Sequence, residues 1–580
     1  MSGKSYLLCA AIDFGTTFSG YAFSSKHEFE QDPLKVCASS WMGGSRMTIS
    51  LKTSSTVLFR PDKSFDSFGF EAEDRYSDLC CEENHKDWYY FRRFKMMLYN
   101  SKDVHRSNML KDETGKEMPA IVVFAASIKY MKEHLMRKLE ETHLGITTDD
   151  MKWVLTVPAI WDDAAKQFMR EAAVKAGIEG HRLSLALEPE AASMFCKHLP
   201  VARYEGKGQR EISCFKPGSK YLVLDAGGGT IDITVHEVNR NGTLRELYKA
   251  NGGTWGGTTI DKAFIDFISS ITGPEVMDRF RSENQEDYMD LLREFEVKKR
   301  AIGQSLDSRT TFKIPITLYE TFRDVTGREI RDEVKENKLL SGKVAFAGDK
   351  MRVEPGAVKE LFSETTKHII DHLKGIFADP TASGADTVLM VGGFSESPML
   401  RETVQEAFPD KRVIVPHEAG LAVLKGAVIF GHNDKEITAR IAKYTYGLKT
   451  YKDFDPKKHP KDKMFLNENK RPTVRGCFSR LVEIGQTVSP NEPTPSKPYF
   501  PTGNTSGFTI KLYASSDKKP MFVDDPGCFP IGEVYVHCVD KYGKVGSADV
   551  SLIFGGTELK VRAVDSKTKE ERIASFDFLA

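Results

Sequence analysis

One short pattern occurs twice in this chain, and it restricts the possible folds more than any other feature. The stretch AIDFGTTFSGYAF, residues 11–23, reads as a strand that ends near Asp13, a Gly-Thr-Thr turn and a second strand. The stretch YLVLDAGGGTIDITVHEV, residues 221–238, repeats this order around Asp225. Backbone N–H groups and hydroxyls in such a turn form a concave arc that suits a phosphate. A carboxylate beside a phosphate requires a divalent cation between them, so the pattern predicts a metal-nucleotide site.

A strand and a helix follow each copy of this pattern. The stretch WVLTVPAIWDDAAKQFMREAAVKAG, residues 153–177, reads as a strand, a break and a helix with Asp162 or Asp163 as its N-cap. The stretch TVLMVGGFSESPMLRETVQEAF, residues 387–408, reads as a buried strand, a Gly-Gly turn and a helix with Pro398 at its first position. The sequence therefore predicts an α/β architecture with an internal duplication. A Walker P-loop or dinucleotide fold is not expected, because its glycines lead into a helix rather than back into a strand.

The composition is that of an ordinary globular protein, and it narrows the classes of function. The 580 residues include 82 Lys plus Arg and 82 Asp plus Glu, which gives a formal net charge of zero. This balance provides no electrostatic reason to expect a nucleic-acid partner or an acidic membrane surface. No run approaches the roughly 20 apolar residues of a membrane helix, so no membrane span is expected. The nine cysteines show no CxxC spacing, which is typical of reduced thiols and predicts a cytoplasmic protein.

The character of the sequence changes after AGLAVLKGAVIFGH, residues 419–432. From residue 444 onward, short alternating stretches are separated by Pro and Gly, which is typical of an all-β unit. The predicted organisation is a two-lobe nucleotide-binding domain over 1–432, a linker over 433–443 and a β module over 444–580.

Three aspartates adjoin the predicted phosphate turns, namely Asp13, Asp225 and Asp232. Mg²⁺ keeps several of its waters and takes few protein ligands directly, so these carboxylates are expected to act on the metal mainly through water. Glycine allows the backbone to approach a phosphate closely and to adopt positive φ. The glycines expected to do so are Gly15, Gly227, Gly228 and Gly229, and the Gly392-Gly393 turn, which follows them in the chain, strengthens the pattern.

Several motifs carry a family resemblance. AIDFGTT, LVLDAGGGTIDIT, LALEPEAAS and VLMVGGFSESP resemble the actin-like ATPase superfamily and, within it, the heat shock 70 kDa protein family. FRRFKMMLY, VPAIWDDAAKQFMREAA and LYKANGG look most like the divergent branch called heat shock 70 kDa protein 12. The resemblance covers nearly the whole chain. It implies a duplicated, actin-like (ribonuclease H-like) two-lobe ATPase domain followed by a C-terminal β-sandwich, with ATP or ADP and Mg²⁺ as cofactors.

The resemblance also implies roles on the phosphate side of the site. Lys95 matches the family's catalytic lysine, which positions the attacking water and balances charge on the γ-phosphate. Glu188 matches the acid near that water and the metal. Without the motif context, Lys95 reads as a surface lysine and Glu188 as the cap of the following helix. The phosphate-binding hydroxyls implied are Thr16, Thr17 and Thr230, and the catalytic set is Asp13, Lys95, Glu188, Asp225 and Thr230.

On the nucleoside side, the resemblance turns a charged helix face into a candidate site, where the ordinary reading is a solvated surface. Two positions depart from the family pattern: Glu396 stands where an arginine would lie against adenine, and Gly303 stands where the clamping helix offers a serine. These departures predict an altered grip on the nucleoside. The nucleoside-binding residues implied are Glu296, Lys299, Arg300, Gly392, Gly393, Phe394 and Glu396.

The C-terminal stretch VSLIFGGTELKVRAVDSKTKEERI resembles the family's β-sandwich substrate-binding domain, which captures extended apolar peptides. A protein or peptide partner is therefore expected at the β module. The sequence ends at ASFDFLA without the helical lid of the family, and residues 433–447 lack its acidic-aliphatic linker. Both departures leave the coupling between the domains open.

Three functions remain open from the sequence. The leading one is an ATP-binding, slowly hydrolysing, chaperone-like monomer whose lobes close around MgATP. The second is a nucleotide-gated binding or scaffold protein with little or no hydrolysis, which the missing lid favours and the intact phosphate-side residues oppose. The third is a small-molecule kinase of the same fold, which would have no need of the β module.

Overall fold

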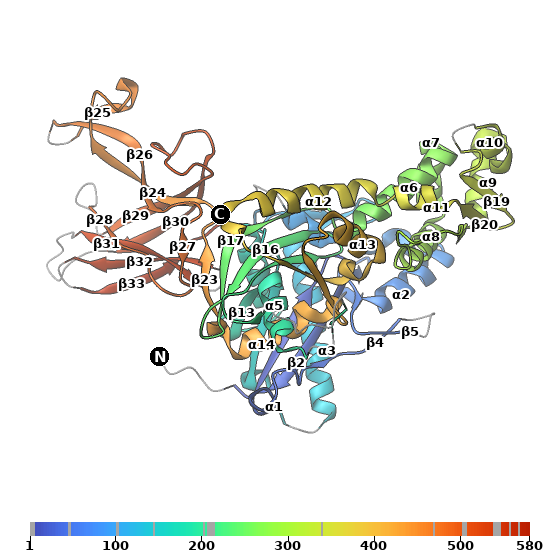
Figure 1. The fold of residues 1–580 in the computed structure, drawn as a ribbon, viewed down its shortest axis with the longest axis horizontal. Coiled ribbons are helices and arrows are strands. Elements are labelled where there is room, and N and C mark those ends of the chain that lie inside the picture. The colour runs from blue at the N-terminus through green and yellow to red at the C-terminus, as the bar shows by residue number, and fades with distance from the viewer. Residues whose placement is uncertain are drawn as a thin grey trace.

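The computed structural model describes residues 6–43, 48–99, 104–142, 145–200, 204–205, 215–337, 340–467, 470–500, 507–537, 547–555, 558–566 and 569–579. Figure 1 shows a two-lobe body, with a β-rich C-terminal module on one side and a helical projection carrying α9 and α10 at the opposite end.

The first lobe is built on a six-stranded sheet in the order β13-β12-β1-β2-β3, with β6 also paired to β2. β1 and β2 form the predicted hairpin, in which Asp13 lies opposite Gly20. β1 pairs in parallel with β12, and β12 with β13. The strands of this sheet are β1 (Leu8–Phe14), β2 (Phe18–Ser25), β3 (Cys37–Ala38), β6 (Thr53–Ser54), β12 (Met151–Val157) and β13 (Leu183–Leu187).

β1 is buried along its whole length, because apolar cores cover both faces of the sheet. Ala10 and Ile12 belong to one core cluster, while Cys9 and Ala11 point the other way into a second. The remaining strands of the lobe are β4 (Trp41–Gly43), β5 (Thr48–Ser50), β7 (Thr56–Phe59), β8 (Phe65–Phe68), β9 (Tyr89–Arg92), β10 (Met109–Lys111) and β11 (Glu117–Pro119). Its helices are α1 (Lys26–Gln31), α2 (Phe70–Cys81), α3 (Ala120–Glu141), α4 (Asp163–Lys175) and α5 (Glu188–His198).

The second lobe repeats this plan in an eight-stranded sheet, ordered β14-β22-β21-β15-β16-β17-β23-β27. β15 and β16 form the second hairpin, in which Asp225 lies directly opposite Asp232. β21 runs parallel to β15, and β22 parallel to β21. The strands are β14 (Tyr204–Glu205), β15 (Lys220–Ala226), β16 (Ile231–Val238), β17 (Leu244–Gly253), β21 (Thr387–Val391), β22 (Arg412–Pro416), β23 (Ile437–Ile441) and β27 (Thr487–Val488).

The helices that follow the parallel strands also correspond between the lobes. α4 follows β12 as α13 (Pro398–Ala407) follows β21, and α5 follows β13 as α14 (Ala422–His432) follows β22. α5 and α14 pack against each other, and their buried residues form one core with the inner faces of both sheets. The predicted duplication is therefore confirmed at the level of topology. The local signals were also correct: the Asp162 carboxylate accepts the N–H of Ala165 at 2.9 Å as the N-cap of α4, and Pro398 begins α13.

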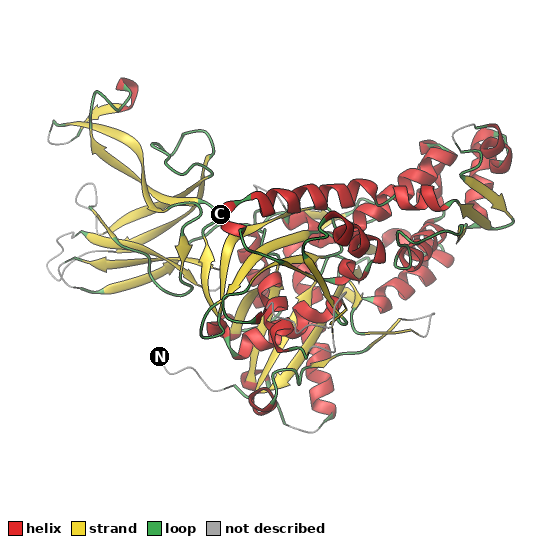
Figure 2. Cartoon of the chain, viewed as in Figure 1, coloured by secondary structure: helices red, strands yellow, loops and turns green. Residues whose placement is uncertain are grey.

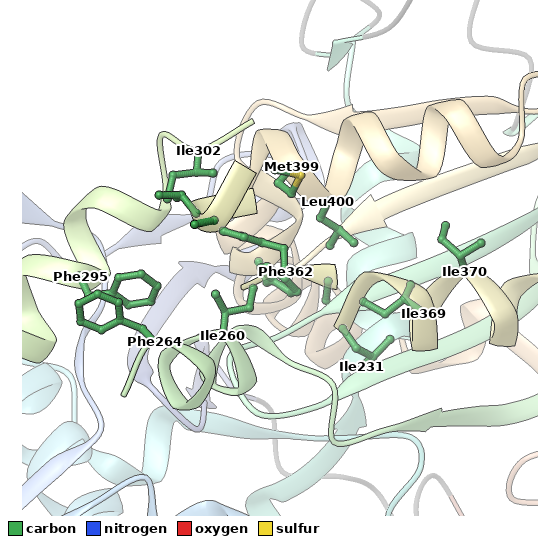
Figure 3. Packing of buried hydrophobic residues seen from close by; sticks show 14 of the residues in the cluster. Ile231, Ile260, Phe264, Phe295, Ile302, Phe362, Ile369, Ile370, Met399 and Leu400 are labelled. Carbon is green, nitrogen blue, oxygen red and sulfur yellow. The ribbon is translucent and has the colours of Figure 1, made fainter. Parts of the chain in front are cut away.

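The largest apolar core lies in the second lobe, where Phe264 and Phe295 stack with ring centroids 4.1 Å apart. Figure 3 shows these rings beside Ile260, with Ile302, Met399 and Leu400 farther along the same core. The outer elements of this lobe are α6 (Gly257–Thr272), α7 (Pro274–Glu283), α8 (Gln285–Lys299), β18 (Thr310–Lys313), α9 (Ile316–Thr326), α10 (Ile330–Glu336), β19 (Val344–Ala347), β20 (Lys350–Val353), α11 (Pro355–Glu360) and α12 (Ser363–Ala378).

The C-terminal module consists of two antiparallel sheets around a shared core that includes Leu512 and Leu552. Figure 2 shows strands without long helices in this part of the molecule. One sheet contains β25 (Met464–Leu466), β26 (Pro472–Val482), β24 (Thr445–Asp453), β29 (Gly507–Ser515) and β30 (Cys528–His537), in that order. The other contains β28 (Lys497–Tyr499), β31 (Ala548–Gly555), β32 (Glu558–Asp565) and β33 (Glu571–Ser575).

The segment predicted as a linker, residues 433–443, is not an open connection. It contains a short 3₁₀ turn, Asp434–Glu436, and strand β23, which pairs with β17 and extends the sheet of the second lobe. β27 then pairs with β23, although it belongs to the stretch predicted as a separate β module. The sequence missed this continuity because a short strand at the edge of a sheet carries little periodic signal.

A second connection joins the C-terminal module to the first lobe. Leu579 is buried in the apolar core of that lobe. The guanidinium of Arg106 bonds both Asp577, at 2.9 Å, and Glu171 on α4, at 2.7 Å. The module is therefore attached to both lobes.

No helix within the described ranges combines the length and the apolar character that crossing a membrane requires.

Candidate functional site

The two Gly-rich turns face each other across the junction of the lobes. A Cβ placed on Gly229 would lie 2.5 Å from the hydroxyl of Thr16, and one on Gly228 would lie 2.9 Å from Thr17 Cγ2 and closer still to its hydroxyl. Only glycine fits at these two positions while the turns are in contact. The second turn is closed by a bond from the N–H of Gly227 to the carbonyl of Thr230, at 2.9 Å. Residues that are more than 200 positions apart are thus brought together as one double turn.

Asp13 stands at the end of β1 and has both carboxylate oxygens occupied. One accepts the ammonium of Lys52 at 2.6 Å, and the other accepts the hydroxyl of Thr156 at 2.7 Å. Burial disfavours the charged form of Asp13, but Lys52, together with Lys95 and the Thr156 hydroxyl, outweighs it and lowers the pKa below its ordinary value. This aspartate is therefore ionised.

Lys95 and Glu188 form a buried pair beside Asp13. The ammonium of Lys95, whose residue is only 4% exposed, bonds Glu188 Oε1 at 2.8 Å and lies 5.1 Å from the centre of the Trp161 ring. The surface interpretation of Lys95 is therefore wrong. Glu188 is the first residue of α5 and makes no capping bond, so the capping interpretation is also wrong. Burial raises the pKa of Glu188, despite the attraction of Lys95.

Asp225 and Asp232 are the carboxylates of the second hairpin, and like charges directly opposite in a sheet destabilise each other. Burial, together with Glu188, Asp232 and Asp13, raises the pKa of Asp225 well above its ordinary value. Burial also raises the pKa of Asp232 to about 7, although the N–H of Ile160 donates to it at 2.9 Å. These two groups need a positive charge to ionise together near neutral pH.

The residues present fit a hydrated divalent cation held together with phosphates. Within the described ranges, no three His, Cys, Asp or Glu side chains are grouped closely enough to hold a metal ion by themselves. Mg²⁺ does not need such a cage, because it keeps its waters and shares phosphate oxygens. The raised pKa of Asp225 and the glycine-lined double turn are the two observations that support this fit.

The expected nucleoside residues of α8 form an ion network. The ammonium of Lys299 bonds Asp261 at 2.5 Å and also pairs with Glu296. Arg300 bonds Glu296 at 2.8 Å, and its guanidinium lies 5.4 Å from the ring centre of Phe18 in the first lobe. Burial works against ionisation of Glu296, yet the two cations lower its pKa. These residues are therefore neither a plain solvated face nor free groups.

The Gly-Gly turn lies against the second hairpin. Gly392 has φ of 83°, and a Cβ on it would collide with the Asp225 carboxylate, whereas a Cβ on Gly393 would meet no atom within 4 Å. Phe394 is buried beside Gly257. The turn therefore brings the backbone of β21 to Asp225.

Glu396 and Gly303, the two residues that depart from the family pattern, both lie against neighbouring residues of the second lobe. Glu396 is exposed and accepts the N–H of Gly420 at 3.1 Å. A Cβ on Gly303 would lie 3.0 Å from Glu402, whose carboxylate accepts the N–H of Gln304 at 2.6 Å. Each replacement thus has a role in the fold of the second lobe.

Comparison with known proteins agrees with this geometry. The model of the family described as Hsp70 protein matches residues 89–461. The chain is 34% identical to human heat shock 70 kDa protein 12B, over 99% of this chain and 92% of the relative. It is 32% identical to heat shock 70 kDa protein 12A from mouse and from human, with the same coverage.

The chain belongs to the Hsp70 family. The predicted resemblance to the divergent 12-like branch is confirmed. It is a mixed α/β, ATP-binding Hsp70-like protein with the actin-like ATPase domain of that family. The matched range includes Lys95 and the second hairpin, formed by β15 and β16, but begins after the first hairpin, formed by β1 and β2.

Sequence reasoning missed three residues at this Hsp70-type site. Lys52 pairs with Asp13, and Arg93 of the first lobe bonds Asp261 of the second at 2.5 Å. Lys52 lies in a stretch without a motif, and Asp261 lies inside an amphipathic helix. The available signal was the charge of the predicted phosphate side, where four expected carboxylates, Asp13, Glu188, Asp225 and Asp232, outnumber the one expected lysine, Lys95.

Proposed function

We propose that this chain binds MgATP at the junction of its two lobes and hydrolyses it slowly. The double turn carries the proposal, because it presents hydroxyls and glycine backbone from both lobes to one place. Three carboxylates, Asp13, Asp225 and Asp232, border it, and Mg²⁺ bound with the polyphosphate would supply the positive charge that lets Asp225 and Asp232 ionise together. When bound, Mg²⁺ would supply charge neutralisation and an oriented shell of water.

Lys95 and Glu188 are proposed to act on the water that attacks the γ-phosphate. Lys95 is buried and held by Glu188, so its position is preorganised. The raised pKa of Glu188 makes its carboxylate a better proton acceptor than an exposed glutamate. Lys95 would hold the water and offset phosphate charge, and Glu188 would accept its proton.

The C-terminal module is proposed to bind a protein or peptide partner and to respond to the state of the lobes. Asp232 accepts the N–H of Ile160, and the carbonyl of Ile160 accepts the ammonium of Lys443 at 2.5 Å. Lys443 lies two residues before β24, the first strand of the module. Two hydrogen bonds thus separate a phosphate-side carboxylate from the chain that enters the module, which supports coupling without the usual acidic linker.

The alternative of a nucleotide-gated scaffold with little hydrolysis has one specific observation in its favour. Both oxygens of Asp13 are engaged by Lys52 and Thr156, and Glu188 is engaged by Lys95. A site whose acids stay engaged after nucleotide binding would hold ATP without activating water.

A single-turnover experiment distinguishes these functions. The full chain is mixed with a substoichiometric amount of labelled MgATP, and protein-bound ATP and ADP are separated over time, with EDTA as the control. Bound ADP that accumulates only with Mg²⁺ is the expected result. Bound ATP that stays intact would favour the scaffold, and the absence of any bound nucleotide would overturn the proposal. We further propose that the protein is cytoplasmic and acts as a monomer, and a concentration-dependent elution volume would contradict the latter.

A further inference from the structure

The segment that leads from Lys52 into β6 lies along the first phosphate turn. β6 pairs with β2, placing Ser54 opposite Phe18. The N–H of Ser55 donates to the carbonyl of Thr17 at 2.8 Å, and its hydroxyl donates to the carbonyl of Gly15 at 2.7 Å. The turn and this segment are therefore one rigid unit, and Lys52 is at its edge.

The ammonium of Lys52 is directed inward. It lies 2.6 Å from Asp13 Oδ2, and its side chain is only 18% exposed. Its charge also acts on Glu188 and Asp225, the other carboxylates of the site. A lysine whose only purpose was solubility would not place its ammonium among three buried carboxylates.

Lys52 differs from Lys95 in how it is held. Lys95 is 4% exposed and is committed to Glu188 and the face of Trp161. In the described part of the chain, Asp13 is the one acidic partner of Lys52 within 4 Å. The Lys52 side chain is a flexible four-carbon chain, and the backbone close to it is held against the turn by hydrogen bonds. A cation in this position can exchange a carboxylate oxygen for a phosphate oxygen without any change in the backbone.

We propose that Lys52 is a second phosphate-binding lysine, which Asp13 holds until nucleotide enters and which then contacts a phosphate oxygen of that nucleotide. The ammonium thereby provides part of the positive charge at the site. The chain retains affinity for polyphosphate nucleotides when Mg²⁺ is absent. This inference rests on the proposed nucleotide site and adds a residue to it.

The test measures the affinity of the full chain for ATP and for adenosine, by titration calorimetry, in Mg²⁺ and in EDTA. Lys52→Met keeps the aliphatic part of the side chain and removes the charge, Lys52→Arg keeps the charge, and Lys129→Met on the exposed side of α3 is the matched control.

We expect wild type to bind ATP in EDTA. Lys52→Met should weaken that binding about tenfold or more, the scale of a charge-assisted hydrogen bond. The loss in Mg²⁺ should be smaller, about threefold, because the metal supplies the missing charge. Adenosine affinity should not change, and Lys52→Arg should retain most of the ATP affinity.

Each other result overturns the inference in a recognisable way. ATP binding in EDTA that is equal in Lys52→Met and Lys129→Met would make Lys52 only a counter-ion of Asp13. An equal loss for adenosine would show that Lys52 acts through the fold. Wild-type binding only in Mg²⁺ would refute the inference and leave the proposed function intact, whereas no ATP binding in either condition would refute both. If Lys52→Met does not fold, as its melting curve would show, Lys52→Gln replaces it in the same comparison.

Discussion

The two hairpins of this protein have the same backbone plan and opposite electrostatics. In the first, Asp13 is neutralised by Lys52 and its pKa is lowered. In the second, Asp225 faces Asp232, neither forms an ion pair with a lysine of the described residues, and the pKa of Asp225 is raised. The carboxylate of the first hairpin is therefore balanced by a protein cation, whereas the two carboxylates of the second hairpin are not.

This difference indicates a division of labour between duplicated lobes. A repeated strand-turn-strand unit places a carboxylate at an equivalent point in each lobe, but the partner of that carboxylate comes from segments that are not repeated. Lys52 lies in a connection of the first lobe, whereas Asp232 of the second hairpin accepts the N–H of Ile160 instead. We infer that the second hairpin is the half that depends on metal.

The largest expected effect is on the Mg²⁺ dependence of nucleotide binding. Asp225→Ala should abolish the gain in nucleotide affinity that Mg²⁺ provides, because the carboxylate most in need of the cation is removed. Calorimetric titration of ADP with and without Mg²⁺ measures the gain. Asp371→Ala, an exposed position on α12, is the control and should behave as wild type. An unchanged gain in Asp225→Ala would place the metal elsewhere.

Lys95→Met should separate hydrolysis from binding. Loss of one preorganised charge at a buried site lowers the rate about a hundredfold or more, while ATP affinity changes only a few-fold because Lys52 and the two turns remain. The single-turnover rate, measured beside that of Lys129→Met, is the readout. Rates within a factor of three of each other would remove Lys95 from the proposed chemistry.

Gly228→Ala tests whether the two hairpins have to touch. The added methyl collides with Thr17, and overpacking of this kind costs about 1–3 kcal/mol. MgATP affinity should therefore fall about tenfold. Gly356→Ala on α11 adds the same methyl in open space and should leave affinity unchanged. If both variants bind equally well, the contact between the turns is not part of the binding state.

The smallest expected effect concerns Glu246 in β17, which extends the second hairpin. Burial raises its pKa from 4.5 to about 8, although the N–H of Ile441 donates to it at 2.7 Å. Between about pH 4.5 and 8, the folded protein therefore keeps a proton on Glu246 that the unfolded chain has lost. The contribution of Glu246 to the free energy of unfolding falls as pH rises through that window. The fall in melting temperature from pH 6 to pH 8 should be smaller in Glu246→Gln than in wild type, by about 2 °C or more. Glu275→Gln, at an exposed carboxyl on α7, should leave the slope unchanged, and an equal slope in both variants would refute the assignment.

Local patterns predicted much of the fold correctly. The hairpins, the N-cap at Asp162 and the start of α13 at Pro398 follow from residues a few positions apart, whose geometry is decided within one turn or one strand. The strands β23 and β27 were not predicted, because short edge strands are stabilised by their partner rather than by their own sequence.

The sequence by itself determined the duplicated hairpins, the carboxylates beside the Gly-rich turns and the change to β structure near residue 444, because each depends on residue type and local spacing. Only the tertiary structure decided how those carboxylates are charged. The pairing of Lys52 with Asp13, the burial of Lys95 against Glu188 and the raised pKa of Asp225 depend on charges and burial contributed by distant segments. Electrostatic energies follow distance in space and local dielectric, and neither quantity can be read from the order of residues in the chain.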